Sequence, residues 1–173
     1  MKYAIVYDSR TGNTELLARA VKQDLPSADC VCFSTVEKAH GIALADLVFV
    51  GFWVDKGECS AKAAAFLQTL HHKKTALFGT CGFGASNAYF ADRLATAAHH
   101  LPDTARLIDG FMCQGKMPQA AKYRYEAALK EDPQDTQAAD MLENFHAAEG
   151  HPDFGDIKAA IAFGAETLKK AEA

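Results

Sequence analysis

Short apolar runs alternate with amphipathic stretches along this chain of 173 residues. Five runs have the length of a β-strand, and they cover residues 4–7, 31–33, 47–52, 75–80 and 107–113. Their apolar residues are continuous rather than alternating, which is typical of strands that are covered on both faces. The pattern therefore predicts an α/β fold, in which a doubly wound parallel sheet carries helices on both faces.

Apolar residues at helical spacing mark the segments between these strands. They predict helices over about 16–25, 66–70 and 90–101, and a final amphipathic helix around Ile157, Ile161 and Leu168. Between the last strand and that final helix lies a segment of about 114–152, which is too long for an ordinary loop. We expect a single domain over residues 1–173, in which this insertion forms its own helices around 123–129 and 136–145.

Six residues follow the first predicted strand and open the first helix: Ser9, Arg10, Thr11, Gly12, Asn13 and Thr14. The first amides of a helix have no acceptor within it, so they can donate to a phosphate, and the hydroxyl groups add donors. The lysine of nucleoside-triphosphate sites and the paired glycines of dinucleotide sites are both missing. The segment predicts a site for a single phosphate; the alternative is a polar turn that only caps the helix.

Two further loops are expected beside this one, because ligands of such sheets bind at the carboxyl ends of the strands. The loop at the end of the third strand contains Phe52, Trp53, Val54, Asp55, Lys56 and Gly57. Trp53 is the only tryptophan of the chain, and an indole stacks well on a flat aromatic ligand. The loop at the end of the fourth strand contains Thr80, Cys81, Gly82, Phe83 and Gly84.

Taken together, the three loops resemble the FMN loops of the flavodoxin family, in particular those of its short-chain, clostridial-like members. The resemblance covers residues 1 to about 115 and the final helix. It implies a sheet of five parallel strands in the order 2-1-3-4-5, and FMN held by its phosphate at residues 9–14. It also implies that Trp53 and Phe83 cover the flavin ring, with Tyr89 as the alternative stacking residue to Phe83. The alternatives are that Trp53 only caps the sheet and that Tyr89 is an ordinary helical residue.

Charge and one glycine refine this resemblance. In short-chain flavodoxins a glycine after the third strand lets one peptide turn over when the flavin is reduced, and Gly57 matches it. Lys56 and Arg10 instead depart from the family, which usually surrounds the ring with carboxylates. A cation near the ring stabilises the reduced flavin anion, so Lys56 favours a less strongly reducing cofactor. Arg10 either adds a second positive charge or points to solvent.

The function that the resemblance implies is electron transfer by FMN between a reductase and an acceptor protein, with no catalytic side chain. The alternative is an FMN-dependent oxidoreductase, or a flavodoxin-like accessory subunit of a larger reductase that uses NAD(P)H-derived electrons. A phosphoaccepting receiver with Asp8, Asp55 and Lys116 is disfavoured, because such proteins carry paired acids where Ser9 and Arg10 stand.

Composition narrows the partners. The net charge of -4 argues against nucleic acid, and the apolar runs are too short to span a membrane. We expect a cytoplasmic protein, because the sequence begins with a strand rather than a secretory signal. We also expect it to be a monomer. The five cysteines lack the paired spacing of a metal site, so none is predicted. Residues 131–156 hold eight acids and no lysine or arginine, which indicates either a face that steers a basic partner or plain solvated surface.

Overall fold

Five parallel strands form the centre of the computed structural model, which describes residues 1–84 and 86–173. These strands are β1 (Tyr3–Tyr7), β2 (Cys30–Thr35), β3 (Leu47–Asp55), β5 (Lys74–Cys81) and β6 (Arg106–Gln114). Their order, β2-β1-β3-β5-β6, confirms the predicted order 2-1-3-4-5, which counts these five strands alone. The sequence did not indicate a short strand β4 (Glu58–Cys59), which turns back at the end of β3 and pairs with it in antiparallel.

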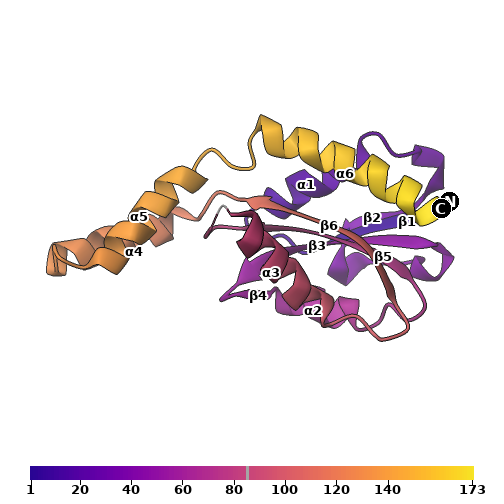
Figure 1. Ribbon diagram of the computed structural model, residues 1–173, viewed down its shortest axis with the longest axis horizontal. Coiled ribbons are helices and arrows are strands. Elements are labelled where there is room, and N and C mark those ends of the chain that lie inside the picture. Colours follow the sequence, from indigo (N-terminus) through magenta and orange to yellow (C-terminus); the bar gives the residue numbers. More distant parts are fainter. Residues whose placement is uncertain (85) are drawn as a thin grey trace.

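Helices cover both faces of the sheet, as predicted (Figure 1). One face carries α1 (Asn13–Lys22) and α6 (Phe154–Glu172), and the other carries α2 (Ala61–Leu67) and α3 (Asn87–Ala98). Short 3₁₀ turns occupy Ser27–Asp29, Val36–Lys38 and Ile42–Leu44. The bounds predicted for the second helix, 66–70, are wrong: α2 ends at Leu67, and Leu70 is buried from the connection that follows. An apolar residue that is buried from a loop has the same sequence signature as one on a helix.

The segment between β6 and α6 forms a pair of packed helices, α4 (Gln119–Glu131) and α5 (Thr136–Ala148). They project from the sheet as an arm, defined here as residues 119–148 (Figure 1). Phe145 is buried on α5, and the ammonium group of Lys122 on α4 lies 6.0 Å from the centre of its ring. Within the described part of the chain, every helix falls short of the length and apolar character needed to cross a membrane.

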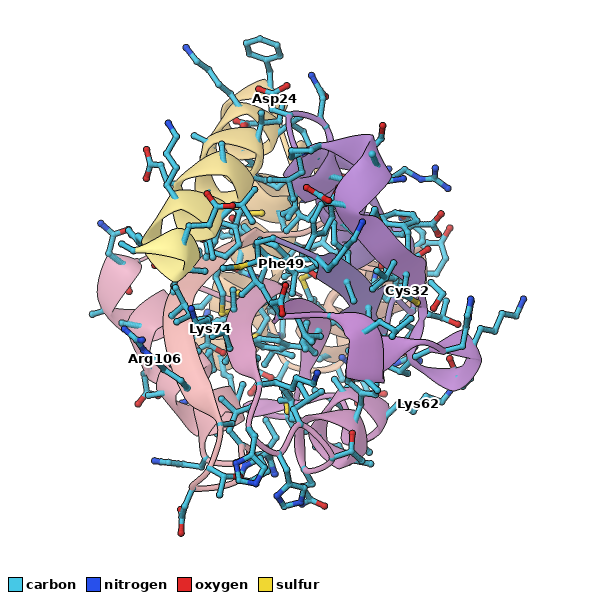
Figure 2. All side chains as sticks on the ribbon, turned by 90° about the vertical axis from the view of Figure 1, so that its right-hand side faces the viewer. Asp24, Cys32, Phe49, Lys62, Lys74 and Arg106 are labelled. Carbon is cyan, nitrogen blue, oxygen red and sulfur yellow. The ribbon has the colours of Figure 1, made fainter. Side chains whose placement is uncertain are left out.

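The core lies in two layers, one on each face of the sheet, because successive residues of a strand point to opposite sides. Tyr3, Ile5 and Tyr7 of β1 pack towards α1 and α6, whereas residues 4 and 6 pack towards α2 and α3. Phe49 lies in the middle of the molecule (Figure 2), and its ring meets the ring of Phe163 on α6 edge to face at 6.1 Å. These apolar layers fix the sheet and thereby the position of the loops at its carboxyl edge.

Substitution of Gly164 by alanine is expected to lower the free energy of unfolding by about 1–3 kcal/mol. A Cβ atom at Gly164 would lie far inside contact distance of the carbonyl oxygen of Val21, so α6 would have to move away from α1. Backbone cannot yield as a flexible side chain can, and this cost exceeds the gain in helix propensity. Urea unfolding measures the effect, and Gly150→Ala is the control because a Cβ there meets nothing within 4 Å. Equal stability of both variants would contradict close packing of α1 on α6.

Candidate functional site

A cavity of about 700 Å³ opens at the carboxyl edge of the sheet. The loops that follow β1, β3 and β5 meet there, which is the convergence that the fold rule predicts. Thirteen residues singled out in the sequence line it: Arg10, Thr11, Asn13, Trp53, Val54, Asp55, Lys56, Gly57, Thr80, Cys81, Gly82, Phe83 and Tyr89. The structure thus brings most of the predicted residues to one hollow, although they come from distant parts of the chain.

Five other predicted residues are not part of this lining: Ser9, Gly12, Thr14, Phe52 and Gly84. Ser9 Oγ accepts hydrogen bonds from the amides of Gly12 and Glu15, both at 3.2 Å, and so shapes the loop from within. The buried hydroxyl of Thr14 lies 3.1 Å from that of Thr80 and 3.4 Å from the carbonyl oxygen of Phe52. Thr14 therefore joins the start of α1 to the ends of β3 and β5 through its side chain, and its amide is the group that remains for a ligand.

The start of α1 has the properties of an anion site. Its N-cap is Gly12, at φ 93°, and no side chain caps the helix. Within residues 1–84 and 86–173, the amides of Arg10, Thr11, Asn13 and Thr14 have no hydrogen-bond acceptor. Unpaired amides at a helix N-terminus favour a phosphate or another anion, both by direct hydrogen bonding and through the helix dipole.

Trp53 forms a wall of the cavity and is held at a defined angle. Its indole Nε1 donates a hydrogen bond of 2.9 Å to Oδ2 of Asp8, the first residue after β1. The guanidinium carbon of Arg10 lies 5.5 Å from the centre of the indole ring. A partly buried indole with its N–H paired offers a rigid aromatic surface, which suits a flat ligand.

A tight turn joins β3 to β4 beside Trp53. Lys56, at φ 50°, and Gly57, at φ 89°, both occupy the left-handed region, as a two-residue hairpin turn requires. The guanidinium of Arg93 on α3 donates to the carbonyl oxygen of Gly57 and also lies 5.2 Å from the centre of the Tyr89 ring. The turn is therefore anchored to α3, with Arg93 as a link that the sequence alone did not indicate.

Phe83 stands at the rim of the cavity, in the loop after β5. Its side chain is 46% exposed, and its ring meets that of Tyr89 edge to face, with centres 6.2 Å apart. Tyr89 supports Phe83 and lines the cavity as well. The two aromatic residues that sequence reasoning treated as alternatives act together as one wall.

A fourth segment completes the cavity and was missed as part of the site: Gly115, Lys116, Met117, Pro118, Ala120, Ala121 and Arg124. Asn13 Nδ2 donates to the carbonyl oxygen of Lys116 at 2.9 Å, which ties this segment to the loop after β1. The chains approach so closely that a Cβ on Gly115 would come within 2.7 Å of that nitrogen. The sequence did offer a signal for this segment, because Gly115 directly follows the last predicted parallel strand. The end of that strand lies at the same carboxyl edge of the sheet as the three predicted loops.

The cavity is cationic in a protein that is acidic overall. Arg10, Lys56, Lys116 and Arg124 line it beside a single carboxylate, that of Asp55. The chain as a whole has a net charge of -4. Clustered charge of one sign in a hollow raises the local concentration of oppositely charged ligands, so the cavity favours an anion.

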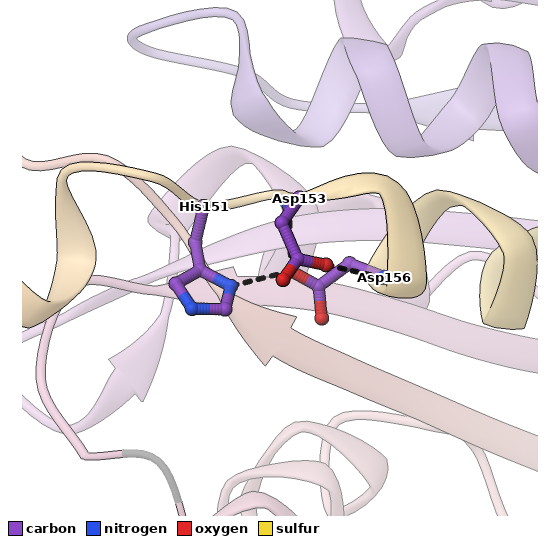
Figure 3. Close-up of side chains that lie close together, drawn as sticks. All are labelled: His151, Asp153 and Asp156. Atoms are coloured by element: carbon purple, nitrogen blue, oxygen red, sulfur yellow. Dashed lines mark hydrogen bonds and ion pairs between the residues drawn. The ribbon is translucent and has the colours of Figure 1, made fainter.

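One further polar cluster lies outside the cavity (Figure 3). His151 Nδ1 lies 2.6 Å from Oδ2 of Asp156, and Asp153 and Asp156 form a capping box at the start of α6. The carbonyl oxygen of His151 accepts a hydrogen bond of 2.7 Å from the amide of Lys116. These contacts give the cluster a structural role: it caps the start of α6 and links that helix to the segment after β6.

The geometry defines an α/β protein with a cationic cavity, walled by aromatic side chains, at the carboxyl edge of its parallel sheet. This chain belongs to the flavodoxin family, because a family model described as a flavodoxin domain matches residues 4–164. The flavodoxin-like domain-containing protein BilS of Clostridium symbiosum is 40% identical over 174 residues, which cover 92% of each chain.

Solved structures show the same fold. The crystal structure of oxidised flavodoxin 2 from Bacillus cereus matches with a TM-score of 0.60 at 19% identity, over 98% of this chain and 99% of that one. A flavoprotein from Lactobacillus acidophilus, solved in complex with FMN, matches with a TM-score of 0.50 at 15% identity, over 65% of this chain and 93% of that one. At these identities the likeness speaks for the fold alone.

Family membership makes the chain an FMN-binding flavoprotein. The residues at the cavity fit this cofactor. In the described part of the chain, four amides at the start of α1 lack an acceptor and can donate to phosphate oxygens, and aromatic side chains stand at two walls. The donor set is also cationic, which suits the two negative charges that a phosphate monoester approaches at neutral pH.

Proposed function

We propose that this flavoprotein is an electron carrier, which accepts electrons from a reductase and passes them to an acceptor protein. The observation that carries the proposal is the position of the aromatic wall at the surface, with Phe83 46% exposed at the rim of the cavity. A cofactor held there presents an edge to a docked partner. FMN, when bound, supplies the electron chemistry, and the protein sets its orientation and its reduction potentials.

Each loop has a part in this proposal. The amides of residues 10–14 hold the phosphate, and Trp53 and Phe83 cover the ring, with Tyr89 behind Phe83. The turn at Lys56 and Gly57 and the loop of residues 80–84 border the ring from the two sides of the cavity. All eighteen residues predicted from the sequence then act either as lining or as the layer that shapes it.

A second candidate function is an accessory subunit of a larger reductase that receives NAD(P)H-derived electrons. The arm favours this candidate, because α4 and α5 project well clear of the sheet (Figure 1). Such a projection offers a partner an additional surface beside the cavity. In both functions the flavin passes its electrons to another protein.

The test combines spectroscopy with turnover. Protein reconstituted with FMN is titrated with dithionite while its visible spectrum is recorded, and is then mixed with NADH or NADPH alone. A carrier binds FMN in one-to-one ratio and oxidises neither nucleotide until a flavodoxin reductase is added, whereupon it reduces cytochrome c. Rapid oxidation of a nucleotide by the protein alone would instead make it an oxidoreductase. A preparation that ignores added FMN would overturn the proposal.

Lys56→Glu is expected to lower the potential for the second electron by about 40 mV, which corresponds to about 1 kcal/mol for a one-electron step. Lys56 lines the cavity, and its ammonium group favours a reduced flavin anion, whereas a carboxylate disfavours it. Redox titration with dye mediators measures the change. Lys130→Glu, at the end of α4, is the control for charge reversal outside the cavity. Equal potentials in the Lys56 variant and the wild type would place this lysine too far from the ring to matter.

A further inference from the structure

A side chain of the arm, that of Asn144 on α5, is hydrogen-bonded to the loop after β5. Its Oδ1 accepts hydrogen bonds from the amide of Gly84, at 3.3 Å, and from Nε2 of Gln114, at 3.2 Å. Its Nδ2 donates to the carbonyl oxygen of Gly82 at 2.8 Å. Asn144 therefore binds the loop of residues 82–84 at both of its glycines, although it follows Gly84 by 60 positions and Gly82 by 62 positions in the chain.

The amide of Asn144 can take only this orientation. With Oδ1 and Nδ2 exchanged, its nitrogen would face the N–H groups of Gly84 and Gln114, and its oxygen would face the carbonyl oxygen of Gly82. Gln114, which is buried at the end of β6, also donates to the carbonyl oxygen of Gly82 at 3.2 Å. The network matches donors to acceptors throughout, which makes each bond dependent on the others.

The side of the loop that the arm contacts is closely packed as well. A Cβ atom on Gly82 would come within 2.6 Å of Cγ of Met117, so the segment leading into the arm lies directly against the loop. Gly82 and Phe83 line the cavity, and within the described residues their amides have no acceptor. The arm thus pairs the polar groups of the loop on one side, while two N–H groups remain for a ligand.

We propose that Asn144 is a positioning residue, which couples α5 of the arm to the FMN site by holding the 82–84 loop against the ring. This inference rests on the proposed placement of the ring between Trp53 and Phe83. A loop fixed in advance loses less conformational entropy when the ligand binds, so the clamp increases affinity without touching FMN. Because residues 10–14 hold the phosphate, the effect of Asn144 belongs to the ring end alone.

The first test compares the dissociation constants of FMN and riboflavin, measured by quenching of flavin fluorescence, in the wild type and Asn144→Ala. Loss of the clamp is expected to weaken both flavins about tenfold, which corresponds to about 1.4 kcal/mol. The ratio of the two constants should stay the same, because riboflavin lacks only the phosphate. Gln137→Ala removes an exposed amide from the same helix and should leave both constants unchanged.

A second variant separates positioning from general damage to the fold. The carboxyl group in Asn144→Asp accepts from Gly84 when ionised but repels the carbonyl oxygen of Gly82; when protonated it donates to that oxygen, as the asparagine does. Riboflavin binding by this variant should therefore tighten as the pH falls from 7 to about 4.5, relative to wild type. Riboflavin is used because it has no phosphate that titrates in this range.

The outcomes distinguish this inference from the proposed function. Unchanged flavin binding in Asn144→Ala, a changed ratio of the two constants, or a flat pH profile in Asn144→Asp would overturn the role of Asn144. In each of these cases the wild type would still bind FMN and carry electrons. Failure of the wild type to transfer electrons would overturn the proposed function, whereas the binding comparison would remain valid.

Discussion

Replacement of Trp53 by alanine is expected to raise the dissociation constant of FMN by about 5- to 150-fold, which corresponds to about 1–3 kcal/mol. The indole is a wall of the cavity, and its hydrogen bond to Asp8 holds it there. Alanine removes both the stacking surface and most of the apolar area at that wall. Fluorescence titration with FMN measures the change.

Two further variants separate the two roles of Trp53. Trp53→Phe keeps an aromatic ring but removes the donor to Asp8, so it should lose less affinity than the alanine variant. Asp8→Ala keeps the indole and frees its N–H, which tests whether the fixed angle matters. An unchanged dissociation constant in Trp53→Ala would remove this residue from the FMN site and leave Phe83 and Tyr89 as the stacking residues.

The protein is expected to lose stability steeply between pH 9 and pH 12, because several buried thiols resist ionisation. Burial raises the pKa of Cys59 to about 11 and that of Cys81 to about 12, and it raises the pKa of Cys113 further. In the unfolded chain these thiols ionise at their ordinary pKa, near 8.5. Their contribution is therefore complete below that value and is lost as the pH rises towards the folded pKa values.

The loss amounts to about 2.6 kcal/mol for each of these thiols at pH 10.5, a sizeable share of the stability of an ordinary domain. Urea unfolding in the presence of a reductant at pH 7.5 and at pH 10.5 measures it. Burial also raises the pKa values of Tyr3 and Tyr7, so the thiols must be isolated by substitution. The double variant Cys81→Ala, Cys113→Ala should show a smaller loss than the wild type between the two pH values.

Ser60→Ala is the matched control, since it removes one buried side-chain atom that does not ionise between pH 7.5 and 10.5. It should lose as much stability as the wild type between pH 7.5 and 10.5. The same loss in the double variant would show that Cys81 and Cys113 ionise in the folded protein and are reached by solvent. Because Cys81 also lines the cavity, its neutral thiol is expected to remain unreactive towards alkylating reagents at pH 8 in the folded state.

The structure places the acidic stretch of residues 131–156 mainly on the arm. Most of it lies on α5 and in the connections at either end, and two of its acids, Asp153 and Asp156, start α6. The carboxylates of those two residues cap the helix, whereas the side chain of Asn144, in the same stretch, is hydrogen-bonded to the 82–84 loop. Steering of a basic partner by the remaining acids stays a prediction, as does the plain solvated surface.

Local patterns determined the type and order of the main elements. Continuous apolar runs predicted buried parallel strands, because a strand that is covered on both faces has no need for alternating apolar and polar residues. The order of the five strands followed from the family resemblance. The polar hexapeptide at residues 9–14 predicted a helix start with unpaired amides, and such amides are present at α1. These features depend on neighbours in the chain, which is why a single sequence reveals them.

Contacts between distant segments were decided by the tertiary structure alone. The bond between Trp53 and Asp8, the link from Arg93 to Gly57 and the clamp of Asn144 on the 82–84 loop each join residues at least 36 positions apart. The lining supplied by residues 115–124 likewise follows from where β6 ends beside β5. No periodicity in the chain encodes such pairings, because they depend on the packing of whole elements. The sequence determined the flavodoxin-like frame and the polar start of its first helix, and folding decided which side chains hold the cavity in shape.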